Sequence, residues 1–270
     1  MKSRILQVSD LHLGSSDPEI DEVASGLRAL IERQQPALIV ASGDLTHRNV
    51  AAEHRQAADL LRSLGPPVLA IPGNHDIPAT PPGRLTDPFA AFSAEWGDIE
   101  PMFESPALTV VALNSVRGWL YQEGYVGTAQ LARAARTFAA APATACKVVV
   151  THHHLASAPW RPTKRPLMPR STILQRLNEA GVEVVLAGHI HQASSLSTSE
   201  FRTDLDRPTV LVTSPGLGRP RHGRHFEARG ANTITADEDV LIVETHGWSG
   251  TDFVSLAQRR YPRTCCVPQS

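Results

Sequence analysis

Short apolar runs that end in a carboxylate, an amide or an imidazole recur along this chain and restrict the folds open to it. The run 4–9 leads into Asp10 and His12, and the run 68–71 leads into the tetrad Gly-Asn-His-Asp at 73–76. Apolar runs of this length that end at glycine or proline are typical of buried strands that deliver a tight loop. The sequence therefore predicts strands whose ends carry polar side chains.

Segments with helical periodicity separate these runs. Apolar side chains recur on one face of residues 20–35, and residues 51–64 repeat the pattern. Apolar strands that alternate with helices are typical of a parallel sheet covered on both faces. We expect strands at 4–9, 37–41, 68–71, 108–113, 147–150 and 182–187, and helices at 20–35, 51–64, 89–95, 129–140 and 171–180, the last two capped by Thr128 and Ser171.

The pattern changes after residue 191, where helical periodicity gives way to short β-prone runs. We expect strands at 194–199, 209–213, 232–235, 240–245 and 253–257, joined by turns into a second sheet. The chain carries neither an internal repeat nor a linker. Residues 1–261 are therefore predicted to form a single α/β domain of two packed sheets, followed by a disordered tail at 262–270.

Composition excludes several classes of protein. Hydrophobic residues make up 41% of the 270 residues and the formal net charge is −1, values typical of a globular protein without a polyanionic partner. No stretch is long and apolar enough to cross a bilayer, and the start lacks a signal-peptide core. Three cysteines without framework spacing indicate a reducing compartment. We expect a cytoplasmic protein without a membrane partner, with nucleic acid disfavoured and a homodimer left open.

The polar residues at the strand ends form one predicted metal site. Because carboxyl ends of parallel strands share one edge of a sheet, residues far apart in sequence should converge there. Carboxylates, imidazoles and an amide without thiolates suit Mn, Fe or Zn, and a central carboxylate can bridge two such ions about 3.5–4 Å apart. The candidates are Asp10, His12, Asp44, Asn74, His75, His152, His153, His154, His189 and His191.

Each motif also has a simpler interpretation. Any one of them alone fits a turn, and the three adjacent histidines fit a solvated loop, with at least one of them in water. We expect Asp76 to orient a ligand rather than to be one. For His47 a place at the rim of the site and a plain surface position are equally open. Five motifs in order, each at a strand end, are what favours a common site.

Together the motifs resemble those of the calcineurin-like metallophosphoesterase superfamily. Its ordered signature is Asp-x-His, Gly-Asp, Gly-Asn-His, a histidine region and Gly-His-x-His, and the resemblance spans residues 4–191. It implies a four-layer α/β/β/α sandwich of two mixed sheets. The chain looks most similar to the class III cyclic nucleotide phosphodiesterases and related bacterial phosphoesterases, partly through the turn Thr-Ser-Pro-Gly at 213–216.

The resemblance also implies a role for each residue. The first ion would be held by Asp10, His12, Asp44 and His191, and the second by Asp44, Asn74, His152 and His189. Asp44 would bridge the two divalent ions, a metal-bridging hydroxide would attack phosphorus, and Asn74 and His75 would bind substrate. His75 would contact the phosphate or protonate the leaving oxygen, so Asp44 and His75 are the predicted catalytic residues. Family members often have His-His-Pro where this chain has His-His-His-Leu at 152–155; strand register favours His152, with His153 left open.

The expected substrate is a small phosphoester. A phosphodiester leads, with 3',5'-cyclic nucleotides as one candidate; a phosphomonoesterase or a pyrophosphatase on a nucleotide or lipid head group is the main alternative. A nuclease is less favoured because the charge is near neutral, and a scaffold without metals is disfavoured because every ligand type is present. The candidate phosphate contacts are Arg161 and Arg165 in the loop 156–169 and Arg219, Arg221 and Arg224 in the loop 217–229. The second loop could close over the site as a lid.

Overall fold

The computed structural model describes residues 2–156, 158, 164–220 and 227–263. Its strands form two six-stranded sheets, the first in the order β12-β11-β10-β1-β2-β3. In this sheet β1, β2 and β3 run parallel, and β10, β11 and β12 extend it as antiparallel neighbours. The bounds are β1 (Ser3–Val8), β2 (Leu38–Ala41), β3 (Val68–Ala70), β10 (Gly230–Ala236), β11 (Val240–Trp248) and β12 (Phe253–Pro262).

The second sheet has the order β4-β5-β6-β7-β9-β8. Its four central strands run parallel, and the edge strands β4 and β8 are antiparallel to them. The bounds are β4 (Met102–Glu104), β5 (Leu108–Ala112), β6 (Cys146–Val150), β7 (Val184–Ala187), β8 (Ser194–Ser197) and β9 (Val210–Thr213). Both sheets are therefore mixed, as the resemblance implied.

The prediction that the late strands form the second sheet by themselves is wrong. Strands β10 to β12 complete the first sheet, where Ile234 pairs with Ile5 of β1, and β8 and β9 complete the second. The early parallel strands are also split, with β1–β3 in one sheet and β5–β7 in the other. Apolar patterning identifies a strand but does not identify its neighbour, since many pairings bury the same face.

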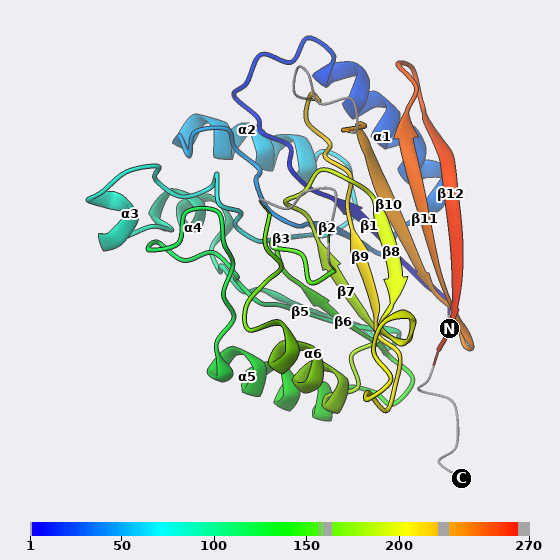
Figure 1. Cartoon of the computed structure of the whole chain (residues 1–270). Helices are drawn as coiled ribbons and strands as arrows, with labels where there is room; N and C mark the ends of the chain where they lie inside the picture. The colour runs from blue at the N-terminus through cyan, green and yellow to red at the C-terminus, as the bar shows by residue number, and fades with distance from the viewer. Residues whose placement is uncertain (1, 157, 159–163, 221–226, 264–270) are drawn as a thin grey trace.

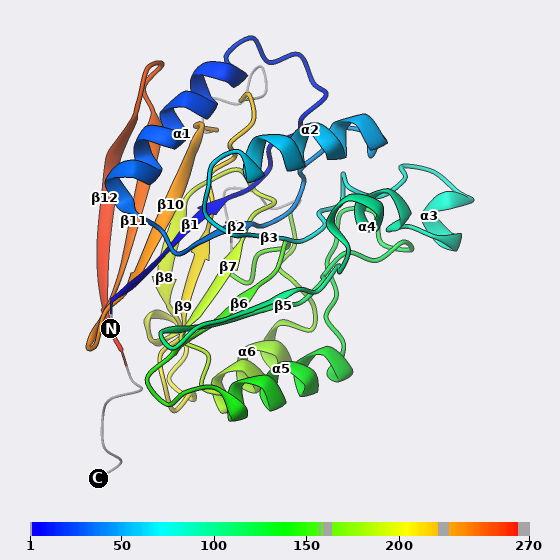
Figure 2. The same ribbon diagram turned by 180° about the vertical axis from the view of Figure 1, so that it is seen from behind.

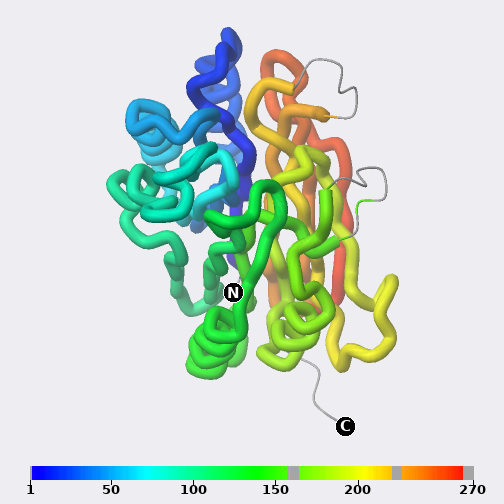
Figure 3. The backbone as a smooth tube through the Cα atoms, turned by 60° about the vertical axis from the view of Figure 1, so that its left-hand side comes forward, coloured from blue at the N-terminus to red at the C-terminus, as the bar shows by residue number. Residues whose placement is uncertain are grey.

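Helices cover the outer face of each sheet, so the predicted four layers are confirmed. Helices α1 (Ile20–Gln34) and α2 (Ala51–Arg62) lie on the first sheet, and α5 (Thr128–Ala140) and α6 (Arg170–Glu179) lie on the second. Figures 1 and 3 show the two helix pairs at opposite sides of the molecule, and Figure 2 shows α1 and α2 together on the first sheet. The short helices α3 (Gly83–Thr86) and α4 (Ala90–Trp96) and the 3-10 helix η1 (Thr198–Glu200) complete the fold.

Three apolar cores hold the layers together. The central one lies between the sheets and joins Val40 of β2 to Val148 of β6 and Leu186 of β7. The second packs Leu27 of α1 on the first sheet, and the third packs Phe138 of α5 on the second. Strand residues thus face alternately the partner sheet and a helix, which explains why the strands are apolar along their whole length.

Two helix starts differ from the prediction. Thr128 is the first residue of α5 rather than its cap, and Gln130 accepts a hydrogen bond from the backbone of Gly127 at 2.9 Å. Ser171 lies inside α6, which begins after Pro169. The rule that serine and threonine cap helices therefore predicted both helices to begin one or two residues too late. The hydrogen bond to Gln130 marks the start of α5, and Pro169 marks the start of α6.

The end of the domain also lies later than predicted. Pro262 is the last residue of β12, and Arg263 forms an ion pair with Glu183, with Nε to Oε2 at 2.8 Å and Nη2 to Oε1 at 2.9 Å. Both side chains are buried. Residues 262 and 263 therefore do not belong to a disordered tail, and the rest of that predicted tail, 264–270, lies outside the described residues. Within the described part, no helix combines the length and apolarity needed to cross a membrane.

Candidate metal centre

The predicted ligands come from both sheets and meet at one end of the sandwich. Asp10, Asp44 and Asn74 follow strands of the first sheet, whereas His152 and His189 follow strands of the second. The loops also bond to one another, as where the backbone of Asp10 donates to the carbonyl of Gly43 at 2.9 Å. The expectation that carboxyl ends of parallel strands share an edge therefore holds for the two sheets together.

One group of side chains gathers around Asp10. Oδ1 of Asp10 lies 3.1 Å from Nε2 of His191, and Nε2 of His12 lies 3.2 Å from the same nitrogen. Oδ2 of Asp44 lies 3.9 Å from Nε2 of His12. These four residues are the set that the resemblance assigned to the first ion.

A second group gathers on the other oxygen of Asp44. Oδ1 of Asp44 lies 3.4 Å from Nε2 of His152, which also lies 3.2 Å from Oδ1 of Asn74 and 3.3 Å from Nδ1 of His189. All four residues are buried. Asp44 thus turns one oxygen towards each group, the arrangement expected of a bridging carboxylate.

The donor set fits divalent cations. Carboxylate oxygens and imidazole nitrogens face one another within the two groups, where their lone pairs would repel unless protons or cations lay between them. Oxygen and nitrogen donors without thiolates suit Mn, Fe and Zn. The residues present therefore fit a pair of such ions.

The backbone at the site adopts a rarely populated conformation. Asp10, His12, Asp44, His189 and His191 all have positive φ, between 47° and 74°. In the described residues only Gln35 and Asn49 share this conformation among residues other than glycine. Left-handed backbone costs free energy at such residues and is concentrated at functional sites, where the fold holds side chains in place.

Gly73 allows the loop that carries Asn74 to lie close to Asp44. A Cβ atom on Gly73 would collide with the backbone and carboxylate of Asp44. Any larger residue would push the Asn74 loop away from the carboxylate of Asp44. The close approach of Gly73 to Asp44 is therefore the physical reason why glycine is needed at this position.

A hydrogen bond to the backbone orients the ring of His152. Nδ1 of His152 lies 2.9 Å from the carbonyl oxygen of Ser42, which leaves Nε2 facing Asp44. Burial by itself would lower the pKa of His152, but Asp44 and Asp10 outweigh it and raise this pKa to about 9. Burial lowers the pKa of His12 to about 4. Burial therefore acts in the same direction on both rings, but the two carboxylates reverse its effect at His152.

Asp76 forms hydrogen bonds to the backbone of the two loops that carry Asp44 and Asn74. Its carboxylate accepts hydrogen bonds from the backbone N–H groups of Leu45 at 3.0 Å, Thr46 at 2.8 Å and Gly73 at 2.8 Å. Burial and the nearby Asp44 carboxylate raise the pKa of Asp76. Asp76 acts on backbone groups beside Asp44 and Asn74 rather than on a ligand side chain.

The three adjacent histidines are all buried, so the expectation that at least one is solvated is wrong. Only His152 faces Asp44, whereas Nδ1 of His153 lies 2.8 Å from the hydroxyl oxygen of Ser115. Burial, together with the neighbouring His152, holds the pKa of His153 well below its usual value. The geometry thus favours His152 over His153 as the ligand. Sequence reasoning did not single out Ser115, although it also follows an apolar run, the same signal that identified the ligands.

His75 and His47 stand at the mouth of the site. Nδ1 of His75 lies 3.1 Å from the carbonyl oxygen of His47, and the ring centre of His75 lies 4.8 Å from that of His12. His47 is exposed, with its ring centre 6.1 Å from that of His75. The structure therefore places His47 at the rim, which the sequence left open.

Two pockets flank this pair of rings. One, of about 390 Å³, is lined by His12, Ser15, Ser16, His47, His75, Arg219 and Pro220. The other, of about 100 Å³, is lined by His47, Arg48, Asn74, His75, Ile77, Ala79, Arg84, Tyr121 and Gln122. Of the predicted phosphate contacts, Arg219 reaches the first pocket, whereas Arg161, Arg221 and Arg224 lie outside the described residues. Sequence reasoning missed Arg84 and Tyr121, which lie outside the strand ends.

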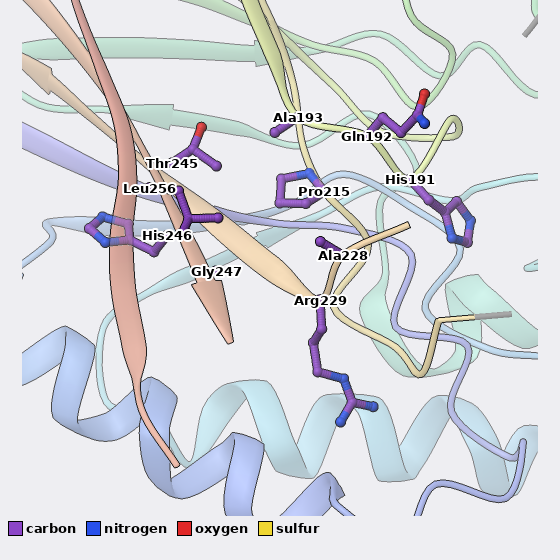
Figure 4. Close-up of a pocket in the computed structure, with 10 residues that line it drawn as sticks. All are labelled: His191, Gln192, Ala193, Pro215, Ala228, Arg229, Thr245, His246, Gly247 and Leu256. Carbon is purple, nitrogen blue, oxygen red and sulfur yellow. The ribbon is translucent and has the colours of Figure 1, made fainter. Parts of the chain in front are cut away.

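A third pocket, of about 450 Å³, is lined by His191 and by residues of β11 and β12 (Figure 4). Apolar groups such as Pro215 and Leu256 line much of it. Arg229 extends away from the other lining residues and pairs with Asp17 and Glu19. This pocket contains neither Asn74 nor His75 and is therefore separate from the predicted phosphate contacts.

Known proteins share this sequence pattern and this fold. The chain is 28% identical over 269 residues to the 3',5'-cyclic adenosine monophosphate phosphodiesterase CpdA of Escherichia coli (strain K12), covering 96% of this chain and 91% of the relative. Purple acid phosphatase PPD1 from yellow lupin superposes with a TM-score of 0.71 at 13% identity, over all of this chain and 57% of that chain. A dimetal phosphatase from Danio rerio superposes with a TM-score of 0.64 at 14% identity, over 94% of this chain and 98% of that one.

At such low identities the two solved structures establish a common fold only. The model for the calcineurin-like phosphoesterase family matches residues 3–193. This segment runs from β1 to the loop after β7 and supplies every side chain of the two donor groups. The chain therefore belongs to the calcineurin-like phosphoesterase family and is a phosphoric ester hydrolase.

Proposed function

We propose that this protein is a dinuclear metal-dependent phosphodiesterase that hydrolyses 3',5'-cyclic nucleotides or similar small diesters. The observation that carries the proposal is the carboxylate of Asp44, whose two oxygens face two separate groups of donors. The cyclic adenosine monophosphate phosphodiesterase CpdA, similar over nearly the full chain, supports the substrate class. We further propose a cytoplasmic enzyme that takes a small phosphoester rather than a nucleic acid or a membrane.

The donor groups would hold the two ions in the way that the sequence predicts. Asp10, His12 and His191 would bind one ion, Asn74, His152 and His189 the other, and Asp44 both. Such an ion pair lowers the pKa of a water molecule and neutralises charge that develops on the phosphoryl oxygens. The ions are Mn, Fe, Zn or a mixed pair, as this donor chemistry allows.

The chain's own residues would then position the ester and supply a proton. Nδ1 of His75 donates to the carbonyl oxygen of His47, so Nε2 is the nitrogen that can reach substrate. In its protonated form this Nε2–H can donate to a phosphoryl oxygen or to the leaving oxygen. Asp44 accepts a hydrogen bond at 2.7 Å from the backbone of His75, which ties the proton donor to the bridging carboxylate.

The two pockets at the mouth favour a diester over a monoester. His75 lines both, so a phosphoryl group beside it would have space for the two separate arms of an open diester such as bis(p-nitrophenyl) phosphate. In a 3',5'-cyclic nucleotide the two ester oxygens belong to one ring, so this argument applies to the open diesters. A monoester carries only one such arm. A phosphomonoesterase would leave one pocket without use.

The test compares diester and monoester turnover by the Mn-loaded enzyme. We expect hydrolysis of 3',5'-cyclic AMP and of bis(p-nitrophenyl) phosphate, with p-nitrophenyl phosphate turned over more slowly. A higher kcat/KM for the monoester would favour the phosphomonoesterase instead. Absence of any turnover by the metal-loaded protein would overturn the proposal.

A further inference from the structure

The loop between β5 and α5 exposes three large aromatic side chains. Trp119 is 71% exposed, Tyr121 is 66% exposed and Tyr125 is 41% exposed. Exposed aromatic side chains gathered in one loop can mark a surface that binds another molecule. Near the start of the loop, the hydroxyl of Ser115 lies 2.8 Å from Nδ1 of His153, the residue after His152, so this end of the loop lies beside the candidate metal centre.

The middle of this loop is fixed by Arg84. The guanidinium of Arg84, from α3, donates hydrogen bonds to the carbonyl oxygens of Pro78 at 2.9 Å and Leu120 at 2.6 Å. Its Cζ also lies 5.1 Å from the ring centre of Tyr121, within the range of a cation–π contact. Tyr121 is therefore held from one side by a buried arginine, while most of its surface remains exposed.

Only one of the three aromatic residues reaches the predicted phosphate contacts. Tyr121 lines the pocket that also contains Asn74 and His75, whereas neither Trp119 nor Tyr125 is among the described residues that line it. Gln122, the next residue, lines the same pocket and accepts a hydrogen bond from Lys164. A ligand with its phosphoryl group beside Asn74 and His75 would therefore meet an aromatic face and an amide within the same pocket.

We propose that Tyr121 is a stacking platform for the nucleobase of the substrate, supported from behind by Arg84. The proposal rests on the proposed phosphodiesterase function and narrows its substrates to esters that carry a planar aromatic heterocycle. Base–aromatic stacking contributes about 1–3 kcal/mol per base, which corresponds to about a 5- to 150-fold change in affinity. Tyr121 acts here as a specificity residue and takes no part in the proton transfer.

The test uses two ligands that differ only in the base. AMP and ribose 5-phosphate carry the same phosphate and sugar, and their affinities for the Mn-loaded protein can be measured by calorimetry. We expect Tyr121→Ala to weaken AMP binding about 5- to 150-fold while ribose 5-phosphate binding stays unchanged. Tyr121→Phe keeps the ring and should retain AMP affinity.

Tyr125→Ala is the matched control, because Tyr125 also lies over an arginine, Arg117, with 5.8 Å between Cζ and the ring centre, but does not line the pocket. It should leave the affinity for AMP unchanged. Unaltered AMP binding in Tyr121→Ala, or an equal loss for ribose 5-phosphate, would overturn the stacking proposal. Those results would leave the phosphodiesterase function standing if the enzyme still hydrolyses cyclic AMP, since turnover is assayed separately.

Discussion

Asp44 and His152 follow strands of different sheets, yet Oδ1 of Asp44 lies 3.4 Å from Nε2 of His152. The catalytic end of the molecule is therefore built across the junction of the two sheets. The inter-sheet core, which includes Val40 of β2 and Val150 of β6, holds together the two strands that lead to these residues. The relationship explains why a phosphoesterase site of this kind requires both halves of the sandwich.

The first prediction separates His152 from His153. His152→Ala should lose metal from the group around Asn74 and His189, because its Nε2 faces both residues. His153→Ala, a change of the same size one residue along, should keep its metal, since His153 bonds to Ser115 instead. Metal content by mass spectrometry and folding by circular dichroism decide this, and metal loss confined to His153→Ala would reverse the assignment.

The second prediction concerns the ligands at either end of the site. Asn74→Ala and His191→Ala should each abolish hydrolysis of bis(p-nitrophenyl) phosphate, because each removes a donor from one of the two groups. Arg176→Ala, a substitution of an exposed arginine on α6, serves as the control and should retain activity. Initial rates at saturating Mn²⁺ provide the measurement. Near wild-type rates in both ligand variants would argue against catalysis at this site.

The third prediction assigns the proton donor. His75→Ala should lower kcat for 3',5'-cyclic AMP about 10²- to 10⁴-fold, the range typical of general acid catalysis. The loss should be smaller for bis(p-nitrophenyl) phosphate, whose leaving group needs no proton. Metal content should be retained, because His75 belongs to neither proposed ligand set. An equal loss on both substrates would indicate that His75 only binds the phosphate.

The fourth prediction concerns stability. Arg263→Ala should reduce the free energy of unfolding by about 3–5 kcal/mol, because it leaves the buried carboxylate of Glu183 without its partner. Arg259→Ala removes an exposed pair with Glu200 and should cost only about 0–1 kcal/mol. Urea denaturation of both variants measures the difference. Equal costs would mean that the Arg263 pair does not anchor the end of β12.

Much of the site could be predicted because each donor belongs to a short local sequence pattern. Each donor follows an apolar run directly, so the pattern located Asp10, Asp44, Asn74, His152 and His189 without knowledge of the sheets. The left-handed backbone at three of these five residues, Asp10, Asp44 and His189, carries no sequence signal in a residue other than glycine.

The arrangement of strands could not be predicted in the same way. The pairing of Ile5 with Ile234 depends on contacts between residues more than two hundred positions apart, and apolar patterning is the same for either sheet. Tyr121 was missed for a related reason, because a loop aromatic gains its meaning only from the pocket beside it. The resemblance to a known family supplied the four layers that the pattern alone left undetermined.

The most direct test of the account is the metal content of the wild-type protein and of Asp44→Asn after loading with Mn²⁺ and removal of free metal. The variant keeps the volume of the side chain but loses the charge that both donor groups share. We predict two ions per chain in the wild type and at least one fewer in the variant, because the Asp44 carboxylate faces both donor groups and would bridge the two ions. A wild-type protein that retains no metal, or an Asp44→Asn variant with undiminished metal, would contradict the account.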